Sequence, residues 1–409
     1  MFSKRTNWNF SENKLSLHLK SLKRQGIAII DLSESNPTHC NFKYLTDAKL
    51  LAPLNRPANL NYNPSPKGKK EARDAIQSYY RNQQIEIDSE RIFLTASTSE
   101  AYHYIFRLIT NPNDRILIPR PSYPLFNFIA DLNDVVLDHY GIRYEHEKWK
   151  INFRESAGSL GSDTKAIIVV HPNNPTGSFL KIHEAKELIQ TAKLKSLALI
   201  SDEVFSDYGF RKDANRMTSL ANTKEVLTFT LGGISKCLGL PQMKLSWMIL
   251  NGPEKMVSKA TERLEVISDT YLSVNTPSQE ALSYWFSYKD QIQNEIKERT
   301  GANRTWLSKK LLHDKTGISC LEPEGGWYAI LKLPNFKNEE EWAFEFLEQE
   351  HVFVHPGYFF DFNEEPYVVV SLLSECPRFQ EGCERIVNHI SACHSKAEGL
   401  RMTSSVRSD

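Results

Sequence analysis

Between residues 91 and 251 the chain alternates short apolar segments with segments whose apolar residues recur at helical spacing. The apolar segments read RIFLTA, RILIPR, VVLDHY, KAIIVVHP, LALISDEV, VLTFTLGG and LSWMIL. Strands that alternate with helices in this way predict a largely parallel sheet with helices on both of its faces. We therefore expect an α/β fold for this part of the chain.

The pattern changes after residue 290, where a long polar helix is expected to precede two strand-like segments, PEGGWYAILKLP and EEPYVVVSLL. This change predicts a second, smaller α+β domain. We expect four parts along the chain: an N-terminal arm with part of the small domain (1–45), a large domain (46–290), a small C-terminal domain (291–394) and a disordered tail (395–409).

Charge and composition narrow the class of protein. The 409 residues include 50 Lys and Arg and 50 Asp and Glu, so the formal net charge is zero. This balance argues against a nucleic-acid binder or a protein of acidic membrane surfaces, because neither would have a strong attractive field. No segment is apolar for long enough to span a bilayer, the N-terminal residues have no apolar signal-peptide core, and the six cysteines form no C-x-x-C pair. We expect a cytoplasmic protein with free thiols.

Polar residues follow the ends of three expected strands. In VVHPNNPTGSFL the strand gives way to Asn and Pro residues that favour tight turns, and Asn174 lies just beyond its end. Asp202 ends the next strand, and Lys236 follows the one after that. Each residue alone is most often a turn residue, a cap or a solvated charge. Because ligands bind beyond the carboxyl ends of strands in open α/β sheets, we expect all three at one edge.

A second group of residues suggests a phosphate site. Ser97 and Glu100 have the spacing of a capping box, which predicts a helix that begins near Thr98 and Ser99. Hydroxyl groups at a helix N-terminus suit phosphate, and Tyr123, in a loop after the next strand, suits stacking on a planar ligand. With an amide, a carboxylate and a lysine, these groups describe a site for pyridoxal phosphate, whose aldehyde forms a Schiff base with a lysine.

At these residues the chain resembles the class I and II aminotransferases, which are pyridoxal phosphate enzymes of fold type I. The resemblance rests on NNPTG, SDEV and GISKCLGLPQMKLSW, and it extends from SNPT and YNPSPKG to PGYFFDF. It implies an aminotransferase-like fold and an enzyme of amino-acid metabolism that moves an amino group between an amino acid and a 2-oxo acid. Lys236 would form the Schiff base and then move the substrate proton.

The resemblance also implies which residues bind the cofactor. Asp202 would pair with the pyridine nitrogen, and Asn174 would donate to the ring oxygen. The remaining cofactor contacts would come from Thr98, Ser99, Tyr123, Ser235, Lys244 and Tyr62. Tyr62 would reach the site of a neighbouring subunit, so the expected assembly is a homodimer with shared active sites.

Four positions depart from the usual pattern of the family. Phe205 stands where Tyr is usual, Gly233 where Ser is usual, and Lys244 where a phosphate-binding Arg is usual. Val369 aligns with the Arg that holds the α-carboxylate of the substrate. The first three changes tune the cofactor, whereas the fourth leaves the substrate open.

Three other interpretations compete with that of an aminotransferase. A pyridoxal phosphate lyase or decarboxylase uses the same scaffold, so the fold alone does not separate it from an aminotransferase. A non-catalytic ligand-binding protein is disfavoured because the three strand-end residues occur together. A metal site is not expected, since His351 and His355 lie in the strand-like HVFVH, about 13 Å apart. The sequence does not identify the amino donor, the oxo acid or the pathway.

Overall fold

The computed structural model describes residues 1–151, 153, 160–363 and 366–405. The chain divides into two compact units. The first unit contains Met1–Trp8, Asn36–Ile296 and Glu324–Gly326, and the second contains Asn9–Ser35, Lys297–Pro323 and Trp327–Asp409. Compared with the range 46–290 expected from the sequence, the larger unit also includes residues 1–8, 36–45, 291–296 and 324–326.

The first unit is built on an eight-stranded sheet with the order β2-β9-β8-β7-β6-β3-β4-β5. Its strands are β2 (Ile92–Thr95), β3 (Arg115–Arg120), β4 (Val136–Glu145), β5 (Lys148–Ile151), β6 (Thr164–Val170), β7 (Ala198–Asp202), β8 (Thr228–Gly233) and β9 (Ser246–Asn251). The strands from β8 to β4 pair in parallel, whereas β9 is antiparallel to both of its neighbours and β5 is antiparallel to β4. The expected α/β fold with a mostly parallel central sheet is confirmed.

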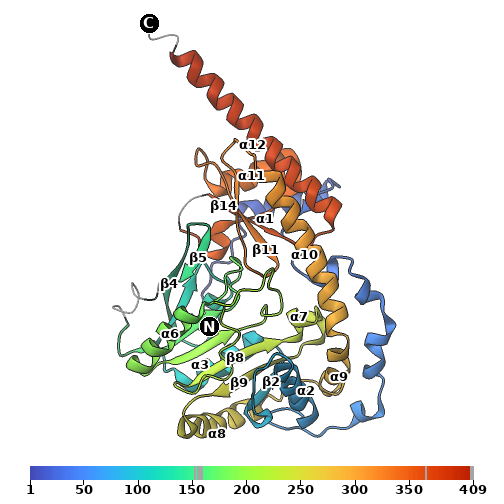
Figure 1. Ribbon diagram of the computed structural model, residues 1–409, viewed down its shortest axis with the longest axis vertical. Coiled ribbons are helices and arrows are strands. Elements are labelled where there is room, and N and C mark those ends of the chain that lie inside the picture. The colour runs from blue at the N-terminus through green and yellow to red at the C-terminus, as the bar shows by residue number, and fades with distance from the viewer. Residues whose placement is uncertain (152, 154–159, 364–365, 406–409) are drawn as a thin grey trace. The chain divides into compact units, whose positions relative to one another are not determined.

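Helices cover both faces of this sheet (Figure 1). They are α2 (Lys70–Arg81), α3 (Thr98–Ile109), α4 (Phe126–Leu132), α6 (Ile182–Lys195), α7 (Ile234–Cys237), α8 (Glu254–Tyr271), α9 (Thr276–Ser287) and the start of α10 (Lys289–Leu311). Buried side chains of α3, α4 and α8 pack against one face, in a core that includes Phe93 and Met248. On the opposite face, the indole Nε1 of Trp247 donates to the Tyr80 hydroxyl of α2 at 3.3 Å. The chain crosses from β2 to β3 in one direction along the sheet and from β6 to β7 in the other. Because such crossovers are right-handed, their helices α3 and α6 lie on opposite faces.

Short 3-10 helices form much of the N-terminal part of the first unit and several of its turns. They are η1 (Lys4–Thr6), η2 (Pro37–His39), η3 (Lys43–Thr46), η4 (Ala48–Leu54), η5 (Pro57–Leu60), η6 (Ser89–Arg91) and η7 (Pro241–Met243). No helix in the part of the chain that the structure describes is both long and apolar enough to cross a membrane.

The second unit contains a four-stranded sheet with the order β10-β11-β14-β13 and a separate parallel pair, β1 with β12. Its strands are β1 (Ile30–Asp31), β10 (Ser319–Leu321), β11 (Tyr328–Lys332), β12 (Val352–Phe353), β13 (His355–Pro356) and β14 (Tyr367–Ser371). Its helices are α1 (Lys14–Arg24), α11 (Glu339–Glu350), η8 (Gly357–Phe360), α12 (Cys376–Ser405) and the remainder of α10. The buried strands β11 and β14 form the centre of its sheet.

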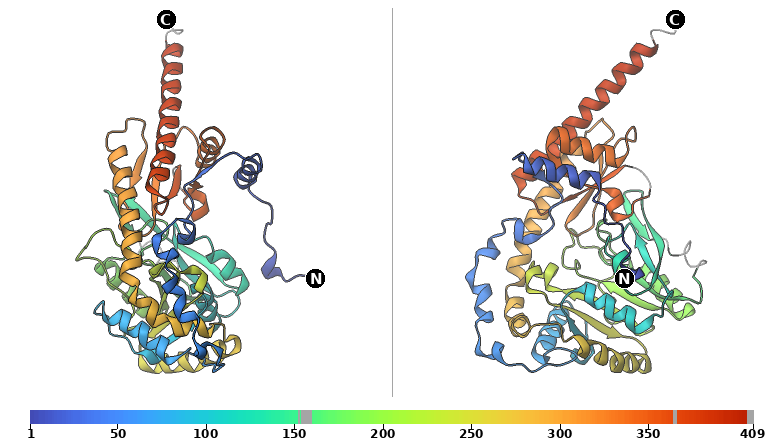
Figure 2. Two further views of the ribbon diagram at one scale, coloured as in Figure 1. Left: turned by 90° about the vertical axis from the view of Figure 1, so that its right-hand side faces the viewer. Right: turned by 180° about the vertical axis from the view of Figure 1, so that it is seen from behind.

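The C-terminal segment differs from the sequence-based expectation. Figure 2 shows α12 as one continuous helix, whose last turns run away from the strands and α11 of the same unit. Residues 395–405 therefore extend a helix where a disordered tail was expected, and residues 406–409 lie outside the described part of the chain.

Candidate active site

Candidate residues from six segments meet one edge of the eight-stranded sheet. The strands β2, β8, β7, β6 and β3 point in the same direction, so their carboxyl ends share this edge, and the antiparallel strand β9 begins there. In sheet order, the candidate residues at this edge are Thr98 and Ser99 after β2, Lys244 before β9, Ser235 and Lys236 after β8, Asp202 ending β7, Asn174 after β6 and Tyr123 after β3.

Asp202 is a buried carboxylate held by two hydrogen bonds. The Tyr102 hydroxyl donates to its Oδ2 at 3.0 Å, and the backbone N–H of Val204 donates to its Oδ1 at 3.2 Å. Burial raises the pKa of Asp202 to about 6, while these hydrogen bonds and the Lys236 amine oppose the rise. A buried carboxylate of this kind gains stability from a cationic partner.

Lys236 lies in α7, one short turn beyond β8. Its Nζ is 5.4 Å from the centre of the Phe205 ring, and its backbone oxygen accepts a hydrogen bond from the Tyr208 hydroxyl at 2.8 Å. Burial lowers the pKa of Lys236 to about 8, and the Asp202 carboxylate opposes this shift. Because the neutral amine is the nucleophile, the lowered pKa favours attack on a carbonyl carbon near neutral pH.

The two adjacent asparagines after β6 have different surroundings. Asn173 stabilises the turn, since its Oδ1 accepts from the Thr176 hydroxyl at 2.9 Å and its Nδ2 donates to the Pro121 carbonyl at 3.3 Å. Asn174 is also buried, but its Oδ1 has no hydrogen-bond partner among the described residues. Buried polar atoms are seldom left without a partner, so the amide of Asn174 suits a polar ligand group.

Tyr123 lies close enough to Asp202 to interact with it electrostatically. Burial, followed by the Asp202 carboxylate, raises the pKa of the Tyr123 phenol. The side chain is 38% exposed, and the edge-to-face contact of its ring is with Phe126, at a centroid separation of 6.2 Å. The ring thus has accessible surface on which a planar ligand can stack.

The N-terminus of α3 is capped much as the sequence predicted. The Ser97 hydroxyl accepts from the Glu100 backbone N–H at 3.2 Å, but the Glu100 carboxylate accepts from the N–H of Ala96, one residue earlier than in a standard capping box. Thr98 and Ser99 form the first turn and are partly buried. The positive end of the helix dipole and these two hydroxyls suit an anion.

Besides Tyr123, the candidates Lys244 and Tyr62 have exposed side chains. Lys244, directly after η7, has a left-handed backbone with φ of 51° and lies two residues before β9. Tyr62 is 80% exposed and lines a separate cavity of about 50 Å³ together with Gly68, Tyr104 and Thr276. The structure therefore brings Lys244 to the sheet edge but does not bring Tyr62 to the other candidates of its own chain.

The positions that depart from the family pattern lie in apolar or crowded surroundings. Phe205 is buried beside Lys236. Val369 is fully buried in β14 of the second unit, opposite Ile330 of β11 and His355 of β13. The strand β14 reads YVVVS and offers no cation for a carboxylate.

Tyr102 is the residue of this site that sequence reasoning missed. It follows Thr98 by four positions, so the two share one side of α3. This spacing could have identified Tyr102 from the sequence, because it places Tyr102 on the side of α3 that carries Thr98 at the sheet edge. Its partner, Asp202, lies 100 positions further along the chain.

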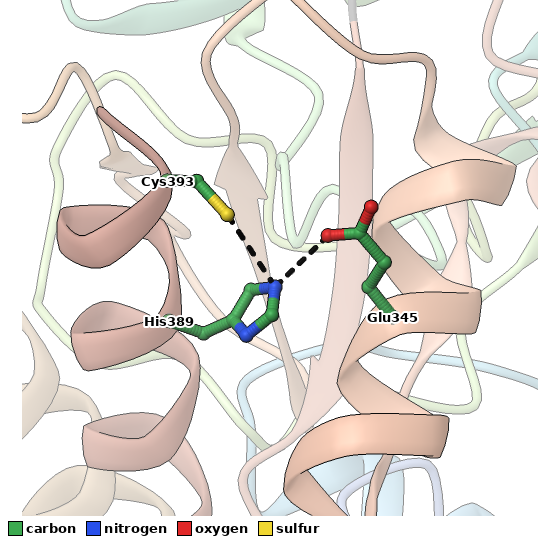
Figure 3. A group of neighbouring side chains, drawn as sticks. All are labelled: Glu345, His389 and Cys393. Atoms are coloured by element: carbon green, nitrogen blue, oxygen red, sulfur yellow. Dashed lines mark hydrogen bonds and ion pairs between the residues drawn. The ribbon is translucent and has the colours of Figure 1, made fainter. Parts of the chain in front are cut away.

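A group of metal-ligating side chains lies within the second unit (Figure 3). Glu345 comes from α11, and His389 and Cys393 come from α12. The Glu345 carboxylate accepts from His389 Nε2 at 2.9 Å and from the Lys337 ammonium at 2.6 Å, and Lys337 Nζ lies 3.6 Å from the Cys393 sulfur. Because an ammonium group already neutralises this carboxylate, the cluster is an ion-pair network that connects α11 and α12.

Comparisons with known proteins agree with this geometry. The family model described as "Aminotransferase class I and II" matches residues 27–386. The glutamate-pyruvate aminotransferase AlaA of Escherichia coli K12 is 25% identical over 384 residues, which cover 92% of this chain and 93% of that protein. The alanine aminotransferase of Mycobacterium tuberculosis H37Rv is 24% identical and covers 74% of this chain and 71% of its own.

A solved structure shows the same fold. The alanine aminotransferase from Pyrococcus furiosus aligns with a TM-score of 0.86 over 96% of this chain and 100% of its own, at 24% sequence identity. The agreement in fold therefore extends over both compact units.

Proposed function

The chain belongs to the class I and II aminotransferases, and on this basis we propose that Lys236 carries its pyridoxal phosphate while an amino group passes from an amino acid to a 2-oxo acid. Enzymes of this family are transferases that use this cofactor. The observation that carries the proposal is the meeting of Lys236, Asp202 and Asn174 at one sheet edge, each from a different strand end.

The chemistry of these three residues fits the cofactor. The Oδ1 of Asn174 has no partner among the described residues, and rotation of the amide would put Nδ2 in its place as a donor to the ring oxygen. The buried Asp202 suits the protonated ring nitrogen, because a cation compensates for the loss of water around the carboxylate. When bound, pyridoxal phosphate supplies an aldehyde carbon for an amine and a ring that withdraws electrons.

Lys236 has two tasks in this proposal. Its pKa of about 8 leaves a larger neutral fraction near pH 7 than an ordinary lysine has, so the amine attacks the aldehyde carbon readily. With the cofactor bound, the same amine would accept the proton from the substrate Cα and deliver it to the carbon that was the aldehyde of the cofactor. The Tyr208 hydroxyl supports this task, because it fixes the backbone oxygen of Lys236.

The remaining candidates would bind the phosphate and the ring face of the cofactor. Thr98 and Ser99, in the first turn of α3, and Ser235, beside the lysine, would donate to its phosphate. Lys244 would add a positive charge without the fork of an arginine. Tyr123 would stack on the ring.

We further propose a cytoplasmic homodimer. Tyr62 is 80% exposed and lies beside Leu60, which is 89% exposed, so this segment presents apolar surface that a partner subunit would cover. Tyr62 would then reach the phosphate of the partner's site. The six cysteines are thiols and not disulfides, which supports a reducing compartment.

The substrate carboxylate needs a cation outside β14. An unpaired carboxylate in a partly dry site costs several kcal/mol, and the side chains of β14 offer no positive charge. We propose that an Arg or Lys from another segment, or from the partner subunit, holds it. From the names of the relatives, glutamate and pyruvate are the first substrates to examine.

The experiment is a screen of amino donors against pyruvate and 2-oxoglutarate, with products identified by mass spectrometry. We expect alanine from glutamate and pyruvate, with 2-oxoglutarate as the second product, and no turnover by Lys236→Ala. Release of ammonia without an oxo-acid acceptor would instead indicate a lyase. Absence of amino transfer with every pair would contradict the proposal.

A further inference from the structure

Gly233 and Ser246 face each other in the antiparallel ladder of β8 and β9. A Cβ added at position 233 would overlap the Oγ of Ser246 and would lie 3.1 Å from its Cβ. A side chain at position 233 would therefore displace the Ser246 hydroxyl from its place on this face of the sheet. In this chain the hydroxyl at this pair of positions comes from β9.

Ser246 lies between the strands that lead to the proposed phosphate contacts. On one side its partner is Thr95 of β2, which continues into Thr98 and Ser99 of α3. On the other side its partner is Gly233, which is followed directly by α7 with Ser235.

The Ser246 side chain also points to the face of the sheet that α3 covers. Met248, two residues further along β9, belongs to the core beneath α3, and residues two apart in a strand share a face. Ser246 is 2% exposed. A buried hydroxyl at this edge, close to a helix N-terminus and two residues after Lys244, has the chemistry of an anion donor.

From these relationships we infer that Ser246 donates a hydrogen bond to the phosphate of the cofactor, and replaces the hydroxyl that position 233 lacks. This inference rests on the proposed function. It explains two residues together: glycine at 233 makes room, and serine at 246 supplies the donor from the neighbouring strand. Compared with the family pattern, in which position 233 is usually Ser, the pair moves one hydroxyl from β8 to β9.

The test compares the binding of pyridoxal phosphate and of pyridoxal, which lacks the phosphate, to the apoprotein. Dissociation constants come from absorbance titrations of wild type, Ser246→Ala and the double variant Gly233→Ser with Ser246→Gly. We expect Ser246→Ala to weaken the binding of pyridoxal phosphate about tenfold, the usual effect of losing a charge-assisted hydrogen bond, and to leave that of pyridoxal unchanged. The double variant should return to within about threefold of wild type, since it moves the hydroxyl back to β8.

Thr230→Val serves as the matched control, because it removes a buried hydroxyl of the same sheet from the opposite face. We expect unchanged binding of both ligands. Equal binding of pyridoxal phosphate by wild type and Ser246→Ala would overturn the inference and leave the proposed function intact. Failure of wild type to bind the cofactor at Lys236 would overturn both. If the double variant does not fold, the dissociation constants of the two ligands for Ser246→Ala still test the inference.

Discussion

The Tyr102 hydroxyl donates a hydrogen bond to Oδ2 of Asp202 across 3.0 Å, and joins the first turns of α3 to the end of β7. This bond opposes the upward shift in the pKa of Asp202 that burial causes. It therefore helps to keep the carboxylate ionised, which is the form that pairs with a protonated ring nitrogen. Tyr102 contacts Asp202, the proposed partner of the cofactor, and acts by positioning this carboxylate.

Tyr102→Phe should weaken cofactor binding. Without the hydroxyl, the pKa of Asp202 rises further, and the carboxylate pairs less favourably with the ring nitrogen. We expect the dissociation constant of pyridoxal phosphate to increase about threefold to tenfold in a titration of the apoprotein. Tyr140→Phe is the control, because its buried hydroxyl donates to the Ile168 carbonyl. An equal effect of both variants would contradict a specific role for Tyr102.

Glu203 is predicted to influence stability through its titration and not to take part in catalysis. Its carboxylate accepts hydrogen bonds from the Ser201 and Ser219 hydroxyls at 2.8 and 2.6 Å and from the Leu220 N–H at 2.9 Å. Burial nevertheless raises the pKa of Glu203 to about 7. Between about pH 4.5 and pH 7 the folded state thus holds a proton that the unfolded state releases, and the free energy of unfolding falls as the pH rises.

The expected result is that Glu203→Gln flattens this slope. The ionisation of Glu203 accounts for a loss of about 3 kcal/mol over this interval, which the amide lacks. Denaturant unfolding of the apoprotein at about pH 5 and pH 7.5 measures the difference. The exposed Glu86→Gln is the control and should follow wild type. A slope that is the same in Glu203→Gln and wild type would show that Glu203 does not titrate in this range.

Phe205→Tyr should change the cofactor's titration. The Phe205 ring centre is 5.4 Å from Lys236 Nζ, so a hydroxyl on this ring would reach the cofactor beside the lysine. A donor to the ring oxygen stabilises its anion. We expect the pH midpoint of the visible absorbance change of the loaded protein to fall by about one unit. An unchanged or raised midpoint would mean that position 205 does not face the ring oxygen.

Much of this arrangement follows from the sequence because it depends on local periodicity. The apolar segments around Asn174, Asp202 and Lys236 have the length and composition of buried parallel strands, and parallel strands end at one edge of a sheet. Knowing the strands was therefore enough to predict that these three residues meet there.

The remaining features depend on register and on long-range packing. The pairing of Gly233 with Ser246 requires the alignment of two strands, and the contact between Tyr102 and Asp202 requires the rotation of α3 about its axis. The spacing from Thr98 indicates which side of α3 carries Tyr102, but neither long-range partner is encoded in a short stretch of sequence. The C-terminal segment was expected to be disordered from its polarity, but it prolongs an established helix, and prolonging a helix avoids the cost of nucleating one.

The central claim is that Lys236 carries the cofactor, and a reduction experiment tests it most directly. The apoprotein is loaded with pyridoxal phosphate, treated with borohydride and digested, and the modified peptide is sequenced by mass spectrometry. We predict a yellow protein and a phosphopyridoxyl group on Lys236, with no stable label in Lys236→Ala. A label on a different lysine, or no label on the loaded wild-type protein, would contradict the account.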